Sequence, residues 1–492
     1  MRLRVALLWA AGAFVALCAV LLIRTWVYST GGADGGGDVV IPIAATVPPD
    51  SSPLHRLSEA IQIPTVTQFN VPANIPQFLK FHAFLQRSFP LVHAKLTREI
   101  VDSGSLIFTW RGTDTTLAPV LLMGHMDVVP VEPGTERDWT HPAFSGAIAD
   151  GSVWGRGTLD DKISVMGLLE ATEALLKEGY QPRRTVMYSF GHTEEGGGSS
   201  ARIVAELFKS RGIAPWFVMD EGGAVGEGLV PGVAGRVALV GVAEKGYLTL
   251  RLTASAEGGH SSMPPRETAV SIVGDAVRKV QGAPLPSRIS GATRAMFETI
   301  GPRLPFGMRI VFANLWLFEP LVTRLLSGDR TGNAMVRTTT AATMMSGGIK
   351  DNVVPTTANA IVNFRLMPGD SVAWVIARVK EIVGDARVTV EAVEGQGREA
   401  SRVSPADSPG FGIIATSIRE SFGARIVAPY LVVGGTDARN FEIVSQSVYR
   451  FAPIVAKPGT TELIHATNEH LAADNYFAAI QFFGRLIGSS TR

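Results

Sequence analysis

Short apolar runs alternate with helical patterns in the first half of the chain. Three apolar, strand-like runs lie at Val120–Met123, Thr185–Phe190 and Trp216–Met219. Between the first two runs, the apolar positions of Ile163–Lys177 recur with the spacing of an amphipathic helix. This alternation predicts an α/β domain with a mainly parallel central sheet, in which sites form at the carboxyl ends of strands.

The pattern changes after Lys245. Six further elements are predicted in the order strand, helix, strand, strand, helix and strand: Tyr247–Ala254, Thr268–Val280, Thr338–Met345, Ala358–Leu366, Val372–Val383 and Arg387–Val393. This order predicts a small α+β, ferredoxin-like unit inserted into the larger domain. The apolar segment Gly282–Arg337 interrupts the unit. Its periodicity fits a buried helix, a substrate-facing surface or an interfacial helix equally well.

The N-terminus carries a membrane-length apolar run. Arg2 and Arg4 precede the uncharged run Val5–Ile23, and Arg24 follows it. A spanning helix needs ~20 residues, whereas the core of a signal peptide has ~7–15. No strong small-residue cleavage site follows, which favours an uncleaved signal anchor over a cleaved signal peptide. The basic N-terminus favours a cytoplasmic start. We therefore expect a membrane-anchored protein whose bulk is extracytoplasmic (periplasm, cell exterior or lumen), and a secreted one if the segment is cleaved.

The length of 492 residues favours two or three domains. The patterns divide the chain into a signal anchor (1–26), a flexible Gly- and Pro-rich linker (27–52), the first part of the larger domain (53–244), the inserted domain (245–396, with the apolar insert 282–337) and the second part of the larger domain (397–492).

Composition narrows the function classes. Hydrophobic residues make up 46% of the chain and charged residues 18%, so a large core can form. The formal net charge is +1, and no basic tract with interleaved aromatic residues is present, which argues against nucleic-acid binding. Cys18, inside the N-terminal apolar run, is the only cysteine. Any metal must therefore be held by His and carboxylate ligands.

Five motifs offer His, Asp or Glu, most of them at the ends of strand-like runs. In chain order they are GHMDVVP (124–130), GRGTLDDK (155–162), HTEEGGG (192–198), VMDEGG (218–223) and ELIHA (462–466). Zinc in hydrolytic sites takes imidazole nitrogen and carboxylate oxygen and leaves a position open for water. Together the motifs supply what two close zinc ions and one activated water require.

Residue types alone leave several roles open. His125 is a natural ligand after a buried strand, and Asp127 on the same face can hold its other ring nitrogen. In the pair Asp160–Asp161, one acid can cap a helix while the other bridges metals. In the pair Glu194–Glu195, one can bind metal while the other acts as a general base. The pair Asp220–Glu221 poses the same question.

The motifs resemble those of the dinuclear zinc metallopeptidases that include carboxypeptidase S, aminoacylase, glutamate carboxypeptidase and succinyl-diaminopimelate desuccinylase. The resemblance covers about Pro53–Gly488. The stretches WGRGTLDDK, EEGGGSSAR and GGTDAR are similar to carboxypeptidase S and N-fatty-acyl-amino acid hydrolases in particular. The resemblance implies a zinc-peptidase-like catalytic domain with an inserted lid or dimerisation domain. It also implies two zinc ions, which cobalt or manganese can replace, and it allows a homodimer.

The resemblance further implies roles for the motif residues. His125 and Asp220 bind one zinc, Glu195 and His465 bind the other, Asp160 bridges them, Glu194 is the general base and Asp127 supports His125. Asp160 is preferred to Asp161 because the bridging Asp of the family stands two residues before the Lys. Asp220 is preferred to Glu221 because it directly follows the strand.

In the inserted domain, the segment GGHSSMP (258–264) matches one whose histidine reaches the scissile carbonyl, often from a partner subunit. His260 is therefore expected to stabilise the oxyanion. Asn352 and Arg365 match positions that hold the substrate carboxylate, and a guanidinium can pair with a carboxylate bidentately. A loop that lets the backbone approach the substrate is expected from three further residues: Gly434, Gly435 and Thr436.

The predicted function is zinc-dependent hydrolysis of the amide bond of a peptide or N-acyl amino acid that bears a free C-terminal carboxylate. Peptides would make the protein a carboxypeptidase, whereas fatty acyl substrates would make it an N-fatty-acyl-amino acid hydrolase or synthase. A non-catalytic, membrane-tethered binding protein of the same fold is disfavoured, because every expected ligand type is present. The serine-hydrolase motif G-x-S-x-G and the metalloprotease motif HExxH are both absent from the sequence.

Overall fold

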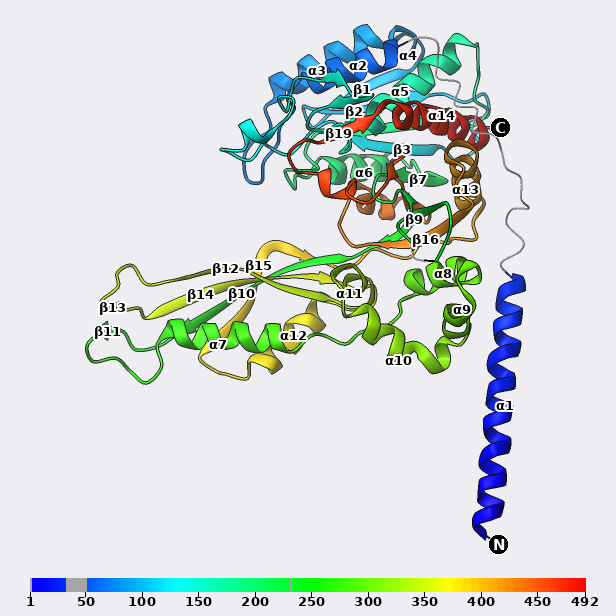
Figure 1. The fold of residues 1–492 in the computed structure, drawn as a ribbon. Coiled ribbons are helices and arrows are strands. Elements are labelled where there is room, and N and C mark those ends of the chain that lie inside the picture. Colours follow the sequence, from blue (N-terminus) through cyan, green and yellow to red (C-terminus); the bar gives the residue numbers. More distant parts are fainter. Residues whose placement is uncertain (1, 32–50, 231) are drawn as a thin grey trace.

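The computed structural model describes residues 2–31, 51–230 and 232–492. Three parts are visible in Figure 1: a large domain, an elongated smaller domain that extends from it, and the N-terminal helix α1 (Arg2–Gly31), which points away from both. The C-terminus lies in the large domain, and the N-terminus lies at the far end of α1.

A mixed, mostly parallel sheet forms the core of the large domain. Its strands are β1 (Thr97–Val101), β2 (Ser105–Trp110), β3 (Val120–His125), β6 (Val186–Gly191), β7 (Phe217–Asp220), β8 (Val225–Glu227), β9 (Arg236–Glu244), β16 (Ile426–Val432), β17 (Val448–Arg450) and β18 (Val455–Ala456). They run in the order β1-β2-β6-β3-β7-β17-β9-β8-β18, and β16 pairs with β9. The central strands β6, β3, β7 and β17 are parallel. The three strands predicted from apolar runs are β3, β6 and β7, and the predicted α/β architecture is confirmed.

Helices cover both faces of this sheet. One face carries α2 (Ser52–Ile61), α3 (Ile75–Ser88), α4 (Pro90–Lys95), α5 (Lys162–Lys177), α13 (Pro409–Phe422) and α14 (Ala473–Ser490), and the other carries α6 (Ser200–Ser210) and the 3-10 helix η3 (Asp437–Ile443). Successive residues of a strand point to opposite faces. Val120 and Leu122 of β3 accordingly pack in one core cluster, and Leu121 and Met123 pack in the other.

A small antiparallel sheet brings the C-terminal motif beside the Gly-rich loop. It consists of β4 (Ala147–Ala149), β5 (Ser152–Trp154) and β19 (His470–Ala472). His470 is paired with Trp154, directly before the loop that starts at Gly155. The short 3-10 helices η1 (Glu136–Asp138) and η4 (Thr461–Leu463) flank this region. Two motifs that lie far apart in the chain therefore meet at one edge of the large domain.

The smaller domain, here called the lid domain, is an α+β unit (246–282 and 339–398). Its sheet has the order β12-β14-β10-β15, and the strands are β10 (Gly246–Ser255), β12 (Thr339–Gly347), β14 (Thr357–Leu366) and β15 (Val388–Arg398). The helices α7 (Ala269–Gly282) and α12 (Val372–Val383) cover the face turned away from the large domain (Figure 1). The short strands β11 (Gly259–His260) and β13 (Val353–Val354) form its far tip.

The apolar segment that interrupts the lid domain folds into helices. They are α8 (Gly291–Ile300), η2 (Gly301–Arg303), α9 (Phe306–Ala313), α10 (Leu315–Leu326) and α11 (Arg330–Val336), here called the insert helices. Their buried residues, such as Met296 and Phe297, share a core cluster with Ile426 and Ala428 of β16. The insert helices therefore cover an edge strand of the large domain, an arrangement that shields strand edges from unwanted pairing.

Helix α1 is longer than predicted. It continues to Gly31, whereas the predicted anchor ends at residue 26 and a flexible linker was predicted over 27–52. The extra turn is helical because its side chains pack on the insert helices: the Tyr28 hydroxyl donates to the Phe297 carbonyl at 2.5 Å. Most of the predicted linker, residues 32–50, lies outside the described residues.

Candidate metal centre

His125 ends β3, and its imidazole is held from one side. Its Nδ1 lies 3.0 Å from the backbone carbonyl oxygen of Asp127 and 3.5 Å from the Asp127 carboxylate. These acceptors favour the tautomer with the proton on Nδ1, which leaves Nε2 free to bind a cation. Nε2 points toward two carboxylates, at 3.0 Å from Asp160 and 3.6 Å from Glu221.

Asp160 lies between two imidazoles. Its Oδ1 is 3.0 Å from His125 Nε2, and its Oδ2 is 3.1 Å from His465 Nε2. Asp161 is turned away: it accepts hydrogen bonds from the His125 backbone N–H at 3.3 Å and from the Ser164 hydroxyl at 2.5 Å. The geometry therefore favours Asp160 over Asp161 as the carboxylate shared between two cations.

Asp127 also positions the two acids of the third motif. Its buried carboxylate accepts hydrogen bonds from the backbone N–H groups of Glu194 at 3.2 Å and Glu195 at 3.0 Å, and from the Thr67 hydroxyl at 2.5 Å. Glu195 reaches the second imidazole, with Oε1 at 3.0 Å from His465 Nε2. One buried carboxylate thus fixes the strand end that carries His125 and the loop that carries both glutamates.

The two acids of the fourth motif have different partners. Asp220, predicted as a ligand, turns its Oδ2 away to the backbone N–H of Ala438 in η3, at 2.7 Å. Glu221 instead faces His125. The ligand atoms of His125, Glu194 and Glu221 lie within 4.8 Å of one another, as do those of His125, Asp160 and Glu195. These distances favour Glu221 beside His125, and Asp220 as a ligand stays a prediction.

Burial and mutual repulsion shape the protonation of these acids. Burial raises the pKa of the Glu194 carboxyl well above its usual range, and nearby Glu221 raises it further against the opposing effect of His125. Burial likewise raises the pKa of Glu221, with a further increase from Asp160. Although burial alone would raise it, hydrogen bonds to His125 and His465 hold the pKa of Asp160 below its usual range. Bound cations would offset the repulsion among these acids.

The loop that carries His465 is held by an ion pair that the sequence analysis did not assign. His465 adopts a positive φ of 65°. Arg156 donates to the His465 carbonyl at 2.9 Å and to the Glu469 carboxylate at 2.6 Å, and both ionic side chains are buried. Glu469 in turn accepts from the backbone N–H of Gly157 and of Leu159. Arg156 lies inside the motif GRGTLDDK, and Glu469 follows the motif ELIHA by three residues, so their position was the available signal.

The donor set suits zinc. The candidate ligands are imidazole nitrogens and carboxylate oxygens. They form two groups, and His125 belongs to both. Asp160 also contacts His465. These are the non-thiolate ligands that zinc takes in catalytic sites. Cys18, the only cysteine of the chain, lies in α1 and does not take part.

The loop of Gly434, Gly435 and Thr436 follows β16 at the same edge of the sheet. The Thr436 backbone N–H donates to Glu244 Oε2 at 2.6 Å, and Glu244 forms a buried ion pair with Arg450 at 2.8 Å. Just after the loop, Asp437 approaches β6 so closely that a Cβ on Gly191 would lie 2.8 Å from its Oδ2. The structure therefore places the predicted loop beside the carboxylate cluster.

Arg365 lies at the end of the lid domain that adjoins the large domain, here called the hinge end, where it is paired with Tyr247 at the start of β10. It is half-buried on the sheet face opposite α7 and α12, and its guanidinium lies 4.8 Å from the centre of the Tyr247 ring. Arg398 approaches the same ring at 5.8 Å. Burial lowers the pKa of Arg365, and the charge of Arg398 contributes to the decrease. An anion would relieve this crowding of positive charge.

His260 and Asn352 lie at the opposite end of the lid domain. His260 is paired with Val353 at the exposed tip, and the Asn352 carbonyl accepts a hydrogen bond from the Ser261 backbone N–H. With a rise of ~3.3 Å per residue, β14 separates Thr357 at the tip end from Arg365 by about 26 Å. Within one chain, the structure therefore does not bring His260 and Asn352 to the site that contains Arg365.

Comparison with known proteins gives the family of the chain. Residues 121–489 match the model of peptidase family M20/M25/M40. The chain is 40% identical over 420 residues to probable carboxypeptidase S-like 2 of Dictyostelium discoideum, covering 85% of this chain and 80% of the relative. It is 38% identical over 439 residues to the N-fatty-acyl-amino acid synthase/hydrolase of Homo sapiens, covering 88% and 86% of the two chains.

Solved structures share the fold. The M20 family metallo-carboxypeptidase Sso-CP2 from Sulfolobus solfataricus superposes with a TM-score of 0.64 at 18% identity, covering 88% of this chain and 98% of that one. Human carnosine dipeptidase 1 gives 0.60 at 15% identity, covering 89% and 95%. The protein is thus a metal-dependent hydrolase by fold and site. It belongs to peptidase family M20/M25/M40.

Proposed function

We propose that this protein uses two zinc ions to hydrolyse the amide bond of an amino-acid derivative that keeps a free carboxylate. The observation that carries the proposal is the Asp160 carboxylate, whose two oxygens lie 3.0 and 3.1 Å from His125 and His465. In this proposal His125 and Glu221 complete one zinc site, Glu195 and His465 complete the other, and both share Asp160.

Glu194 is the proposed general base. Zinc ions at these ligands would supply Lewis acidity and lower the pKa of bound water. Glu194 takes a proton from the attacking water and passes it to the nitrogen of the leaving amine. Burial raises the pKa of Glu194 and bound cations would oppose that rise, so its proton affinity would depend on the metals beside it. Asp127 keeps this carboxylate in place by accepting its backbone N–H.

The hinge end of the lid domain is the proposed carboxylate site. Arg365 presents a guanidinium on the open face of the sheet, with Arg398 beside the same Tyr247 ring. A guanidinium binds a carboxylate through two parallel hydrogen bonds, which fixes both its position and its orientation. The loop of Gly434–Thr436, which the Thr436 backbone N–H fixes to Glu244, is a further proposed contact of the substrate. The free carboxylate of the substrate would thus be recognised apart from its acyl group.

Two substrate classes fit this chemistry. Relatives carry the names carboxypeptidase S-like and N-fatty-acyl-amino acid synthase/hydrolase. Both reactions act on an amide whose nitrogen belongs to an amino acid, so they need the same base, metals and carboxylate site. They differ only in the acyl side. A non-catalytic binding protein is disfavoured, because the complete set of ligands and the base lie together.

Helix α1 is proposed as an uncleaved anchor. The most apolar 18-residue stretch within Arg4–Thr30 has a mean hydropathy of 2.6, and Arg4 precedes it. Basic residues on this side favour a cytoplasmic N-terminus, so the catalytic domain would be extracytoplasmic. The last turns of α1 pack against the insert helices and form hydrogen bonds with Phe297 and Asn314. Cleavage that removed α1 would expose this surface of the insert helices. Retention of α1 therefore preserves an interface.

A homodimer is proposed to complete the site. His260 and Asn352 lie about 26 Å of strand away from Arg365, so they cannot meet one substrate within a single chain. Exposed polar residues at the tip of a lid domain can reach the active site of a second copy instead. In that arrangement His260 would stabilise the oxyanion formed in its partner's site.

The test is an activity comparison on full-length protein in detergent, loaded with zinc or stripped with a chelator. The substrates are a long-chain N-acyl amino acid and a blocked dipeptide with the same C-terminal residue, and the amide-capped form of each serves as a control. We expect zinc-dependent cleavage of at least one acid and loss of activity when its carboxylate is capped. Equal rates with and without zinc, or equal rates on capped substrates, would contradict the proposal.

A further inference from the structure

The insert helices have two distinct surfaces outside their core. One surface contacts α1, and the other presents apolar side chains to solvent. Six large apolar residues of α9 and α10 are between 39% and 68% exposed: Phe306, Met308, Trp316, Leu317, Leu321 and Leu325. Contiguous apolar surface of this kind marks a site of interaction with another molecule or a membrane.

The contact with α1 is specific. Four α1 residues, Cys18, Leu21, Thr25 and Tyr28, recur every three or four positions and form the less exposed stripe of its final turns. Asn314, fully buried between α9 and α10, donates its amide to the Leu21 carbonyl at 3.2 Å. Buried polar groups need such partners, so these hydrogen bonds fix how α1 is rotated and how far it extends past the insert helices.

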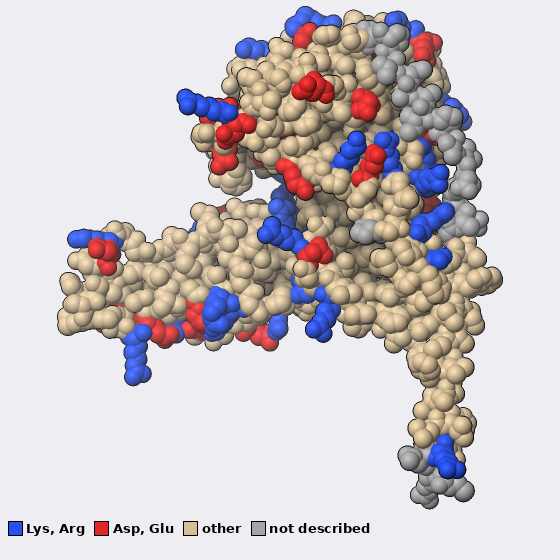
Figure 2. Space-filling model, in the orientation of Figure 1, with Lys and Arg blue, Asp and Glu red and all other residues tan. Residues whose placement is uncertain are grey.

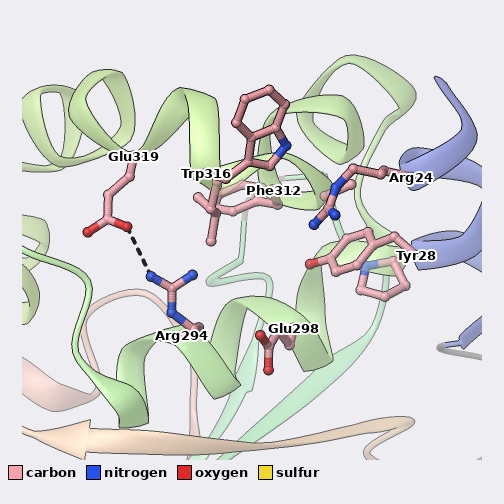
Figure 3. A pocket seen from close by; sticks show the side chains of 10 residues that line it. Arg24, Tyr28, Arg294, Glu298, Phe312, Trp316 and Glu319 are labelled. Atoms are coloured by element: carbon pink, nitrogen blue, oxygen red, sulfur yellow. Dashed lines mark hydrogen bonds and ion pairs between the residues drawn. The ribbon is translucent and has the colours of Figure 1, made fainter. Parts of the chain in front are cut away.

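Figure 3 shows the cavity where α1 meets the insert helices. Its volume is about 510 Å³, and Arg24 and Tyr28 of α1 line it together with Phe312 and Trp316 of the insert helices. Arg24 is the first charged residue after the run Val5–Ile23, so it marks one end of the apolar span. Tyr, Trp and Arg are the residues that gather at the level of lipid head groups.

The apolar face of α10 lies beside this boundary. Trp316 lines the same cavity as Arg24, and Leu317, Leu321 and Leu325 follow at helical spacing along the exposed side. In Figure 2 an uncharged surface continues from α1 onto the neighbouring part of the molecule. At 12 and 8 residues, α10 and α9 are too short to span a bilayer, but amphipathic helices of this length can lie in its surface.

We propose that the exposed apolar face of α9 and α10 lies in the outer interfacial layer of the lipid bilayer, next to α1. The inference rests on the proposed anchor role of α1. The partner is a lipid surface because the contact with α1 sets this face at the level where the span ends. The exposed Arg324 on the same helix can reach lipid phosphates while its aliphatic stem stays among the leucines.

Site-directed spin labelling of the full chain tests the inference. In a Cys18→Ala background, a single cysteine is introduced as Leu321→Cys, Leu79→Cys or Val15→Cys, labelled, and reconstituted in vesicles of phosphatidylcholine and phosphatidylglycerol. Leu79 on α3 is the matched control, since it and Leu321 are each 47% exposed. Val15, in the apolar run of α1, reports whether the anchor is inserted.

We expect the label at 321 to lose most of its accessibility to an aqueous nickel chelate and to gain accessibility to oxygen, as the label at 15 does. The label at 79 should remain fully accessible to nickel. If the label at 321 is as accessible to nickel as the label at 79 while the label at 15 lies in lipid, the inference is overturned and the anchor stands. Aqueous labels at both 15 and 321 overturn the anchor and the inference together. Dipolar coupling between labels at 321, together with low accessibility to both oxygen and nickel, identifies a second copy as the occupant and also overturns the inference.

Discussion

At the scale of single residues, Asp127 holds the site together. Its carbonyl and carboxylate face His125, and its carboxylate accepts the backbone N–H groups of Glu194 and Glu195. A buried carboxylate with three hydrogen-bond donors is rigid, so the proposed base and two of the proposed ligands keep fixed relative positions. Mutation of an outer residue of this kind typically costs about 10–100-fold in metal affinity or activity.

The assignment of Glu221 as a ligand leads to a first prediction. Glu221→Gln should lower the affinity for one zinc ion by at least ~10–100-fold, the loss expected even when only a supporting group is removed. Asp220→Asn should keep both zinc ions, because Asp220 Oδ2 accepts the Ala438 backbone N–H. Zinc titration followed by mass spectrometry measures both. Loss of zinc in Asp220→Asn alone would restore the ligand predicted from sequence.

The directions in which these side chains point explain which of their roles could be predicted from the sequence. Asp160 was preferred to Asp161 by resemblance, and the structure turns Asp160 toward both imidazoles. Neighbouring residues at a strand end point in opposite directions, so either Asp220 or Glu221 could have faced the site. Where β7 ends and turns decides between them, and a single sequence does not contain that information.

At the scale of elements, the pairing of β19 with β5 positions the last ligand. This pairing sets the loop of His465 beside the Gly-rich loop, and the buried pair of Arg156 and Glu469 joins the two loops. The ligand from the C-terminal motif therefore depends on contacts between segments more than three hundred residues apart, as the hydrogen bond between Arg156 and Glu469 illustrates.

Breaking this buried pair should be costly. Arg156→Met and Glu469→Gln should each destabilise the protein by about 3–5 kcal/mol, because one buried partner is left uncompensated, and the double variant should cost less than the sum. The exposed pair Arg202–Glu206 is the control, with an expected coupling of ~0.3–0.5 kcal/mol. Urea unfolding of the zinc-loaded proteins measures each value. Additive costs at Arg156 and Glu469 would show that the pair does not act as a unit.

Elements with a clear period were predictable and the insert helices were not. The buried strands β3, β6 and β7 and the amphipathic helix α12 lie where their apolar patterns place them. The segment 282–337 is apolar on several sides, because α8 packs on β16 while α9 and α10 also contact α1 and expose further apolar residues. Periodicity cannot distinguish apolar residues that pack on the sheet from those that contact α1 or are exposed.

At the scale of the whole molecule, the lid domain separates two groups of predicted substrate contacts. Arg365 lies at its hinge end, and His260 and Asn352 lie at its tip (Figure 1). The motifs identified these residues, but the distance between them follows from the length and direction of β14. That distance is the reason for expecting a second subunit at the site.

Subunit complementation tests this arrangement. His260→Ala and Glu194→Gln should each be inactive as homodimers, because each site lacks one essential group. In a mixed dimer, the chain with an intact Glu194 receives an intact His260 from its partner. Random pairing of equal amounts, by coexpression, should therefore restore about one quarter of wild-type activity, since half of the dimers are mixed and each has one working site. No recovery would contradict action of His260 across subunits.

The most direct test of the central claim is the turnover of the Glu194→Gln variant at measured zinc content, with Glu206→Gln as an exposed control. The account predicts two zinc ions per chain in wild type and in both variants. It also predicts a loss of turnover of at least ~10²–10⁴-fold in Glu194→Gln alone, because a positioned base no longer takes the proton from water. Near-normal turnover of Glu194→Gln with two zinc ions bound, or fewer than two in the wild-type protein, would contradict it.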